Sequence, residues 1–241
     1  RRQRQMCIRD SNSTTYMSFF SQMDTYGDGY AGIGVWRAAF KPLVDRIADT
    51  DIRLQWFCCD RSTGVTDASG NRIKLIRDTQ SPVAVEYQAV KFIGTGRDNI
   101  KAGVFSGWEL GDYIYLRSEE AYMIKMEALA HKGSAEAVTE LNSFMKTRQP
   151  DYNYTFTNKA DLIEEIIYQK RVEFWGEGLE YIDNRRLNIP VDRTDETWGA
   201  ENNNHFSAGK FRYNQEDRPF LYQLPLSEIE NNSQLSPSDQ N

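Results

Sequence analysis

The sequence predicts a mainly α fold in which helical hairpins carry an excursion of loops and short strands. The apolar pattern of residues 112–188 indicates four consecutive helices separated by short turns. Residues 12–111 combine glycine-rich and aromatic loops with short alternating segments, and residues 189–241 are a polar loop followed by a tail. The 241 residues are enough to bury a sizeable core.

The first eleven residues differ from the rest of the chain. Residues 1–11, RRQRQMCIRDS, are basic and polar and show no continuity with the aromatic segment after them. They resemble a translated sequencing adapter. We expect them to be a non-native or disordered leader, in which case Cys7 has no structural role.

Residues 16–34 are rich in aromatic residues and glycine. Gly27, Gly29 and Gly32 match the GxGxxG spacing of a dinucleotide-binding loop. That loop follows a buried parallel strand, and the preceding SFFSQMDT lacks the character of one. Two aspartates before Gly29 resemble half of a calcium loop without its closing glutamate. We interpret the segment as a turn-rich loop, with phosphate or metal binding as the alternative.

Short elements are expected before the helices. Pro42 fits the first turn of a helix that extends to about Ala48. Residues 51–57, DIRLQWF, predict a strand or a short helix. Apolar and polar residues alternate between Ile73 and Tyr87, which indicates short β-hairpin strands.

The sequence marks where the helices of residues 112–188 begin and end. Residues 121–130 are apolar almost all the way round, which is typical of a helix covered on more than one side. Ser118 is its expected N-cap. After a turn at residues 131–133, Ser134 is expected to cap a second helix that Pro150 ends.

The third helix carries Ile163 and Ile167 on one face, with Arg171 on that same face. A buried guanidinium must be paired. We therefore expect Arg171 to meet Glu119 or Glu120 between the two hairpins.

Charged residues within these apolar helices are interpreted as structural ion pairs. They are Arg117, Glu119, Glu120, Arg171 and Glu173. Two carboxylates beside an arginine also resemble a glycosidase site, whose acids flank the scissile bond. A catalytic site needs a cleft and acids with perturbed pKa values, and the sequence shows neither, so we favour the structural interpretation.

Composition excludes several classes of function. The net charge of -6, from 29 basic and 35 acidic residues, argues against nucleic acid as a partner. No apolar run approaches the roughly 20 residues of a membrane span. Cys58 and Cys59 are adjacent, which is poor geometry for a disulfide. His131 and His205 lie far apart, and neither CxxC nor HExxH occurs, so we expect no metal and no cofactor.

Three separated segments resemble, in the right order, the C-terminal part of the SusD/RagB family. They are residues 117–133 (RSEEAYMIKMEALAHKG), residues 162–188 (LIEEIIYQKRVEFWGEGLEYIDNRRLN) and residues 220–235 (FLYQLPLSEIENNSQL). Residues 26–57 are similar to the middle region of that family. The resemblance implies that residues 12–241 are the C-terminal portion of one truncated SusD-like domain with tetratricopeptide-like hairpins.

The resemblance also implies a function. Family members are non-catalytic, glycan-binding lipoproteins on the surface of the Bacteroidetes outer membrane, each closing as a lid over a TonB-dependent, SusC-like transporter. We therefore expect an oligosaccharide ligand, that transporter as partner, and membrane association only through an N-terminal lipid anchor absent from these residues. The alternatives are a peptide-binding or protein-interaction helical scaffold and, ranked last, a glycoside hydrolase.

Ligand-binding residues are sought among aromatic side chains in loops, because sugars present apolar CH faces together with many hydroxyls. The candidates are Tyr26, Tyr30, Trp108 and Trp198. The structural alternative for each is that the ring anchors its loop to the core.

Overall fold

The computed structural model describes residues 7–9, 38–58, 87–89, 91, 112–114 and 116–239. The chain divides into two compact units, an N-terminal unit of residues 1–173 and a C-terminal unit of residues 174–241. The described residues are mostly helical, which confirms the predicted fold class. None of the helices in these ranges is both long and apolar enough to cross a membrane.

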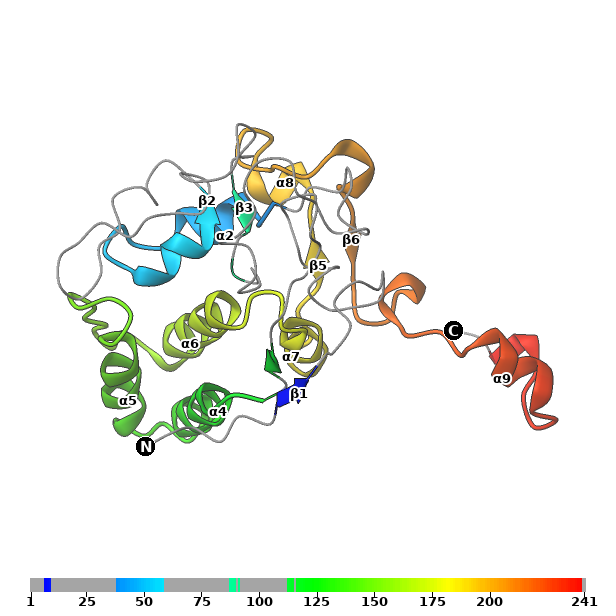
Figure 1. Cartoon of the computed structure of the whole chain (residues 1–241), viewed down its shortest axis with the longest axis horizontal. Helices are drawn as coiled ribbons and strands as arrows, with labels where there is room; N and C mark the ends of the chain where they lie inside the picture. Colours follow the sequence, from blue (N-terminus) through cyan, green and yellow to red (C-terminus); the bar gives the residue numbers. More distant parts are fainter. Residues whose placement is uncertain are drawn as a thin grey trace. The chain divides into compact units, whose positions relative to one another are not determined.

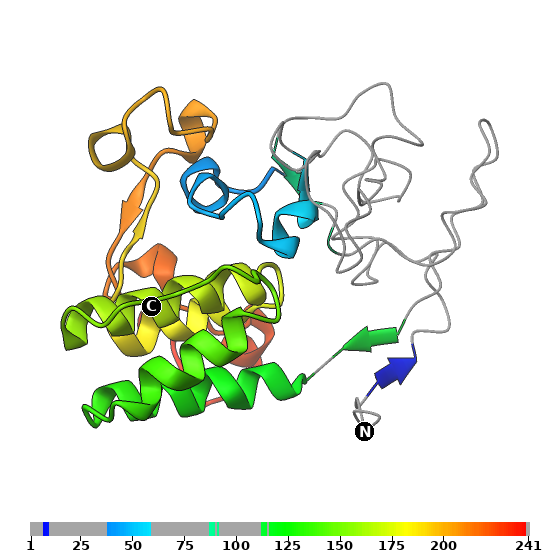
Figure 2. The same cartoon turned by 90° about the vertical axis from the view of Figure 1, so that its left-hand side faces the viewer.

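Three helices form the centre of the N-terminal unit. They are α4 (Ser118–His131), α5 (Glu136–Met145) and α6 (Lys159–Glu173). Helix α4 packs against both α5 and α6, as Figures 1 and 2 show. Its Met123 and Met126 are fully buried, whereas Tyr122 and Ile124 are about half exposed. The predicted middle helix is therefore covered by two other helices, while these two apolar side chains, on different sides of it, remain partly open within the described residues.

The ends of these helices follow local chemistry. Ala135, and not Ser134, occupies the N-cap position of α5, but Ser134 Oγ, one residue earlier, accepts a hydrogen bond from the Glu136 N–H. The prediction for Ser118 was wrong: α4 begins at Ser118, and Arg117 occupies the N-cap position without a capping side chain. Gly133 has a φ of 72°, so the turn between α4 and α5 uses the left-handed region that glycine tolerates.

Short elements precede the helices. Helix α2 (Lys41–Asp45) has Pro42 in its first turn, as predicted, and ends before Ala48. The segment DIRLQWF forms the 3-10 helix η1 (Ile52–Trp56), followed by β2 (Phe57–Cys58). Strand β2 pairs antiparallel with β3 (Gln88–Ala89).

One further pairing joins distant segments. Strand β1 (Cys7–Arg9) pairs antiparallel with β4 (Asp112–Ile114). Strand β1 falls within the proposed leader, whose non-native character stays a prediction. The glycine-rich loop at residues 16–34 and the expected strands between residues 73 and 86 lie outside the described residues.

The C-terminal unit is built from short elements. In chain order they are α7 (Leu179–Leu187), β5 (Val191–Asp192), α8 (Asp195–Trp198), η4 (Ser207–Gly209), β6 (Arg212–Tyr213), η5 (Arg218–Phe220), α9 (Leu226–Asn231) and η6 (Pro237–Asp239). The sequence predicted a polar loop after residue 188, and this was wrong in part. Strand β5 pairs antiparallel with β6, and α8 lies in the connection between them.

Candidate functional site

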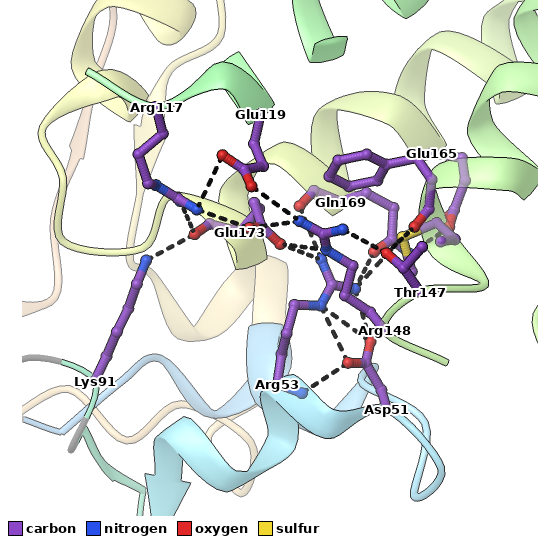
Figure 3. A network of polar contacts seen from close by, with 12 residues as sticks. Asp51, Arg53, Lys91, Arg117, Glu119, Thr147, Arg148, Glu165, Gln169 and Glu173 are labelled. Carbon is purple, nitrogen blue, oxygen red and sulfur yellow. Dashed lines mark hydrogen bonds and ion pairs between the residues drawn. The ribbon is translucent and has the colours of Figure 1, made fainter. Parts of the chain in front are cut away.

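Three of the charged residues singled out in the sequence, Arg117, Glu119 and Glu173, come together at the end of α6, where Glu173 is the last residue (Figure 3). Its side chain is 3% exposed. Its Oε1 accepts a hydrogen bond from Arg117 Nη1 at 2.9 Å, and its Oε2 accepts one from Arg148 Nε at 3.2 Å. Arg53 Nη1 lies 3.5 Å from Oε2. One buried carboxylate thus meets three guanidinium groups.

Arg53 is the most enclosed member of this group, with a side chain only 1% exposed. Its Nε and Nη2 donate to the two oxygens of Asp51, and Nη2 also donates to Gln169 Oε1. The Ile52 N–H donates to the carbonyl of Arg148, which ties η1 to the turn that follows α5. That backbone contact explains why an arginine from an early segment reaches Glu173.

The charges in this region balance. We define the ionic cluster as Asp51, Arg53, Arg117, Glu119, Arg148 and Glu173, which gives three positive and three negative side chains. Burial opposes ionisation of Glu173, but the hydrogen bonds and charges of the surrounding arginines outweigh it and lower its pKa to about 2. Glu173 is therefore an anion at neutral pH, where a general acid would need a raised pKa.

The arginine expected beside Glu119 is not the one found there. Glu119 lies 3.9 Å from Arg148 and 4.0 Å from Arg117, in place of Arg171. Successive helical residues turn by about 100°, so positions 171 and 173 point about 200° apart. Because Glu173 faces the cluster, α6 directs Arg171, which is half-buried, to another side. Glu120 is half-buried in the first turn of α4, outside the cluster.

Sequence reasoning missed Asp51, Arg53 and Arg148 as cluster members. A signal existed for one of them, because Arg53 lies between the apolar residues Ile52 and Leu54. The arrangement does not suit glycoside hydrolysis. Of the three carboxylates considered for that chemistry, Glu119 and Glu173 lie among arginines, and Glu173 is closed off from solvent.

Trp198 is the predicted ligand residue that the structure describes, and Tyr26, Tyr30 and Trp108 lie outside the described ranges. Trp198 ends α8 and is 37% exposed. Its indole Nε1–H donates to the carbonyl of Asp192 at 3.0 Å. The ring is thus held by its nitrogen while part of its surface remains open to solvent.

The segment that carries Trp198 is stabilised by side chains that bind backbone. The Asp192 carboxylate accepts hydrogen bonds from the Thr194 N–H and hydroxyl and from the Thr197 hydroxyl. Burial opposes ionisation of Asp192, but these donors outweigh it and lower its pKa. Asn203, which is buried, donates to the Arg193 carbonyl at 3.0 Å and to Asp195 at 2.8 Å.

Two further aromatic side chains in the C-terminal unit are strongly exposed. Phe206 is 74% exposed and Tyr222 is 78% exposed. Phe206 was not among the predicted ligand residues, although its polar surroundings, NNNHFSAGK, could have marked it. In the part of the chain that the structure describes, no group of three or more His, Cys, Asp and Glu side chains could hold a metal ion.

Comparison with known proteins gives consistent results. The sequence model of the SusD family matches residues 87–241. A SusD-like carbohydrate binding protein from Bacteroides vulgatus ATCC 8482 superposes with a TM-score of 0.60 and 20% identity, over 90% of this chain and 44% of that one. A candidate sugar binding protein from the same organism superposes with a TM-score of 0.59 and 20% sequence identity. The superposition covers 98% of this chain and 44% of that protein.

At this identity the two structures establish a shared fold. The chain spans less than half the length of either of them. No curated protein sequence matches it.

Proposed function

Because the chain belongs to the SusD family, we propose that it forms part of a non-catalytic protein that binds glycans for nutrient uptake. Both solved relatives carry names that describe carbohydrate or sugar binding. The observation that carries the proposal is the exposed but immobilised indole of Trp198.

The chemistry of Trp198 suits a sugar. A sugar ring places its apolar CH face on an aromatic surface and its hydroxyls against polar groups beside it. The Nε1–H bond to Asp192 fixes the ring before any ligand arrives, so little rotamer entropy remains to be lost on binding. Asp195, on the same segment and with a side chain 41% exposed, offers an acceptor to a sugar hydroxyl.

The absence of catalysis is also a proposal, and the ionic cluster supports it. A retaining or inverting glycosidase needs one carboxyl group that can donate a proton at working pH. Glu173 has a pKa of about 2 and lies behind three arginines. We expect no release of reducing ends from any glycan that binds.

The partner and the location follow from the family alone. In our proposal the complete protein sits on the outer-membrane surface through an N-terminal lipid anchor and covers a TonB-dependent, SusC-like transporter. Co-purification of that transporter with the tagged protein from detergent-solubilised membranes would support this. Recovery of the protein without it, from cells that express both, would contradict it.

A helical scaffold that binds peptides is the second candidate. The half-exposed Tyr122 and Ile124 on α4 favour it, because a scaffold presents apolar side chains of its helices to the peptide.

Isothermal titration with a panel of neutral oligosaccharides and a panel of peptides separates the two candidates. We expect glycan binding without turnover. Binding of peptides and of no glycan would refute the glycan proposal.

A further inference from the structure

Arg193, the residue after strand β5, carries a half-buried guanidinium that has no acidic partner. Within residues 116–239, no carboxylate forms an ion pair with it, and it donates no hydrogen bond to a described residue. None of its nitrogens is among the enclosed, unpaired polar atoms of the described residues, so they remain open to solvent. A cation that is partly withdrawn from water and unpaired is unusual in a folded protein. Its donors are available to a group from outside the chain.

The position of Arg193 is fixed before any ligand arrives. Its N–H donates to the Phe211 carbonyl at 2.8 Å, and its own carbonyl accepts from Asn203 Nδ2 at 3.0 Å. The guanidinium lies over the Phe211 ring, 4.9 Å from its centre. Stacking on a ring uses the flat face of a guanidinium and leaves the N–H groups along its edge. The site therefore presents a largely preorganised set of donors.

The acids nearest to Arg193 in the sequence already have cations of their own. Asp192 lies 3.1 Å from Arg212, and Asp195 lies 2.7 Å from Lys210. These five side chains carry three positive and two negative charges, so their net charge is +1. The uncompensated charge is that of Arg193.

His205 lies in the same positive environment. The amide of the buried Asn203 joins the two segments, because its Oδ1 accepts from the His205 N–H at 3.2 Å while its Nδ2 donates to the Arg193 carbonyl. Burial, and then the charges of Arg193 and Lys210, lower the pKa of His205. Two cations from different parts of the segment therefore act at this place.

The acidity of the whole chain does not remove this local charge. The net charge of the chain is -6. At physiological salt the Debye length is about 8 Å, so distant charges are largely screened. Glu196 and Glu201 on the same segment are exposed, and neither forms an ion pair with Arg193. Contacts with the nearest groups therefore decide which ligands bind here.

From these features we infer that Arg193 binds the carboxylate of an acidic saccharide, as found in uronic acids. A guanidinium and a carboxylate match as a fork, with two parallel N–H···O bonds. This inference rests on the proposed function and adds the class of glycan, one that carries negative charges. Arg193 and Trp198 both lie in the connection between β5 and β6. A sulfated saccharide offers similar anionic oxygens, and the test separates the two.

The test compares each acidic oligosaccharide with its own neutral form. The probes are oligomers of galacturonate, glucuronate, mannuronate and guluronate, the same oligomers after reduction of their carboxyl groups, and a sulfated oligogalactose. In calorimetry at constant ionic strength, at least one uronate oligomer should bind with a Kd about 10- to 100-fold lower than that of its reduced form, which is the usual effect of hydrogen bonds to a charged group.

Variants assign this preference to one side chain. Arg193→Gln should raise the Kd for the uronate about 10- to 100-fold and so remove the preference. Arg193→Lys keeps the charge but not the fork, and should retain part of it. Arg218→Gln is the matched control, because Arg218 is exposed, belongs to the same unit and has no ion pair among the described residues. It changes the net charge equally and should leave the preference intact.

The outcomes distinguish the two proposals. Equal affinities of the wild type for uronates and their reduced forms would refute the inference and leave the proposed function standing. The inference would also fail if Arg193→Gln weakened both forms equally, or if Arg218→Gln caused the same loss. Tighter binding of the sulfated oligomer than of every uronate would overturn the assignment to a carboxylate. No binding of any glycan, neutral or acidic, by the wild type would refute both proposals.

Discussion

Replacing the buried carboxylate of Glu173 tests how the helices of the N-terminal unit are held together. Glu173→Gln keeps the shape of the side chain and removes its charge. The guanidinium groups of Arg53, Arg117 and Arg148 would then lose the anion that they share. The ionic cluster would change from neutral to a net charge of about +1 inside a region closed to solvent.

The pKa of Glu173 sets the size of the effect. Burial alone would raise that pKa, but the arginines lower it from 4.5 to about 2. At about 1.4 kcal/mol for each pH unit, the difference corresponds to about 3 kcal/mol of folding free energy at neutral pH. Removing one partner of a buried ion pair typically costs about 3–5 kcal/mol. The two figures agree, and either is a large part of the stability of an ordinary domain.

The pH dependence has a definite sign. The pKa of Glu173 is lower in the folded than in the unfolded chain, so its contribution is complete above about pH 4.5 and is lost as the pH falls toward about 2. The difference in stability between wild type and Glu173→Gln should therefore be smaller at pH 3 than at pH 7.

Urea unfolding followed by far-UV circular dichroism at both pH values measures this difference. Glu164→Gln is the matched control, because Glu164 lies on the same helix with a side chain 76% exposed. We expect the control to change stability by less than about 0.5 kcal/mol. If Glu173→Gln were as stable as the control at pH 7, or if its deficit were the same at pH 3, the reasoning would be refuted.

Three further changes test local features. Gly133→Ala should lower the free energy of unfolding in urea by about 1 kcal/mol, because the φ of 72° is unfavourable for alanine. An added Cβ would meet no atom within 4 Å, so no steric clash adds to this cost. An unchanged urea midpoint would argue against the left-handed turn. Asn203→Ala should cost about 1–3 kcal/mol and speed proteolysis between residues 193 and 210, since its buried amide bonds to the backbone and to Asp195; unchanged cleavage would contradict this. Burial is the main cause, and two nearby cations the lesser one, of a lowered pKa of His205. An NMR titration should therefore place this pKa below 6.5, and the stability of the chain should decline as the pH falls below that value. A pKa above 6.5 would contradict the structure.

The helices of residues 112–188 could be predicted because their signals are local. Apolar spacing marks each helix, and Gly133 and Pro150 mark the turns that separate the first three. The error at Ser118 was a shift of one residue at a helix end, where side-chain capping and backbone geometry need not coincide.

The partners in the ionic cluster could not be predicted in the same way. The sequence shows that Glu119 and Glu173 are charged residues among apolar ones, which is a local observation. Which arginines reach them depends on the path of η1, on the end of α5, and on the rotation of α6 about its axis. Those are tertiary features, and they select Arg53 and Arg148 over Arg171.

The segment around Trp198 illustrates a different limit. Residues 190–218 lack apolar periodicity, so the sequence predicts an irregular loop. The structure there depends on bonds from Asp192, Thr194 and Asn203 to nearby backbone and side-chain groups. Such bonds have no periodic signature in a sequence, yet they hold the exposed aromatic side chain.

The affinity of Trp198→Ala for glycans tests the central claim most directly. About 37% of the residue is open, or about 90 Å² of a side chain of about 250 Å². At about 25 cal/mol per Å², covering that area contributes about 2 kcal/mol, which is about 30-fold in Kd. Phe156→Ala removes another exposed aromatic ring, 54% open, from the other unit and serves as the control.

Calorimetry with the tightest-binding neutral oligosaccharide gives the answer. We predict that Trp198→Ala raises the Kd for this oligosaccharide about 30-fold. Phe156→Ala should leave the Kd unchanged. Equal affinities of wild type and Trp198→Ala for every glycan would contradict the central claim.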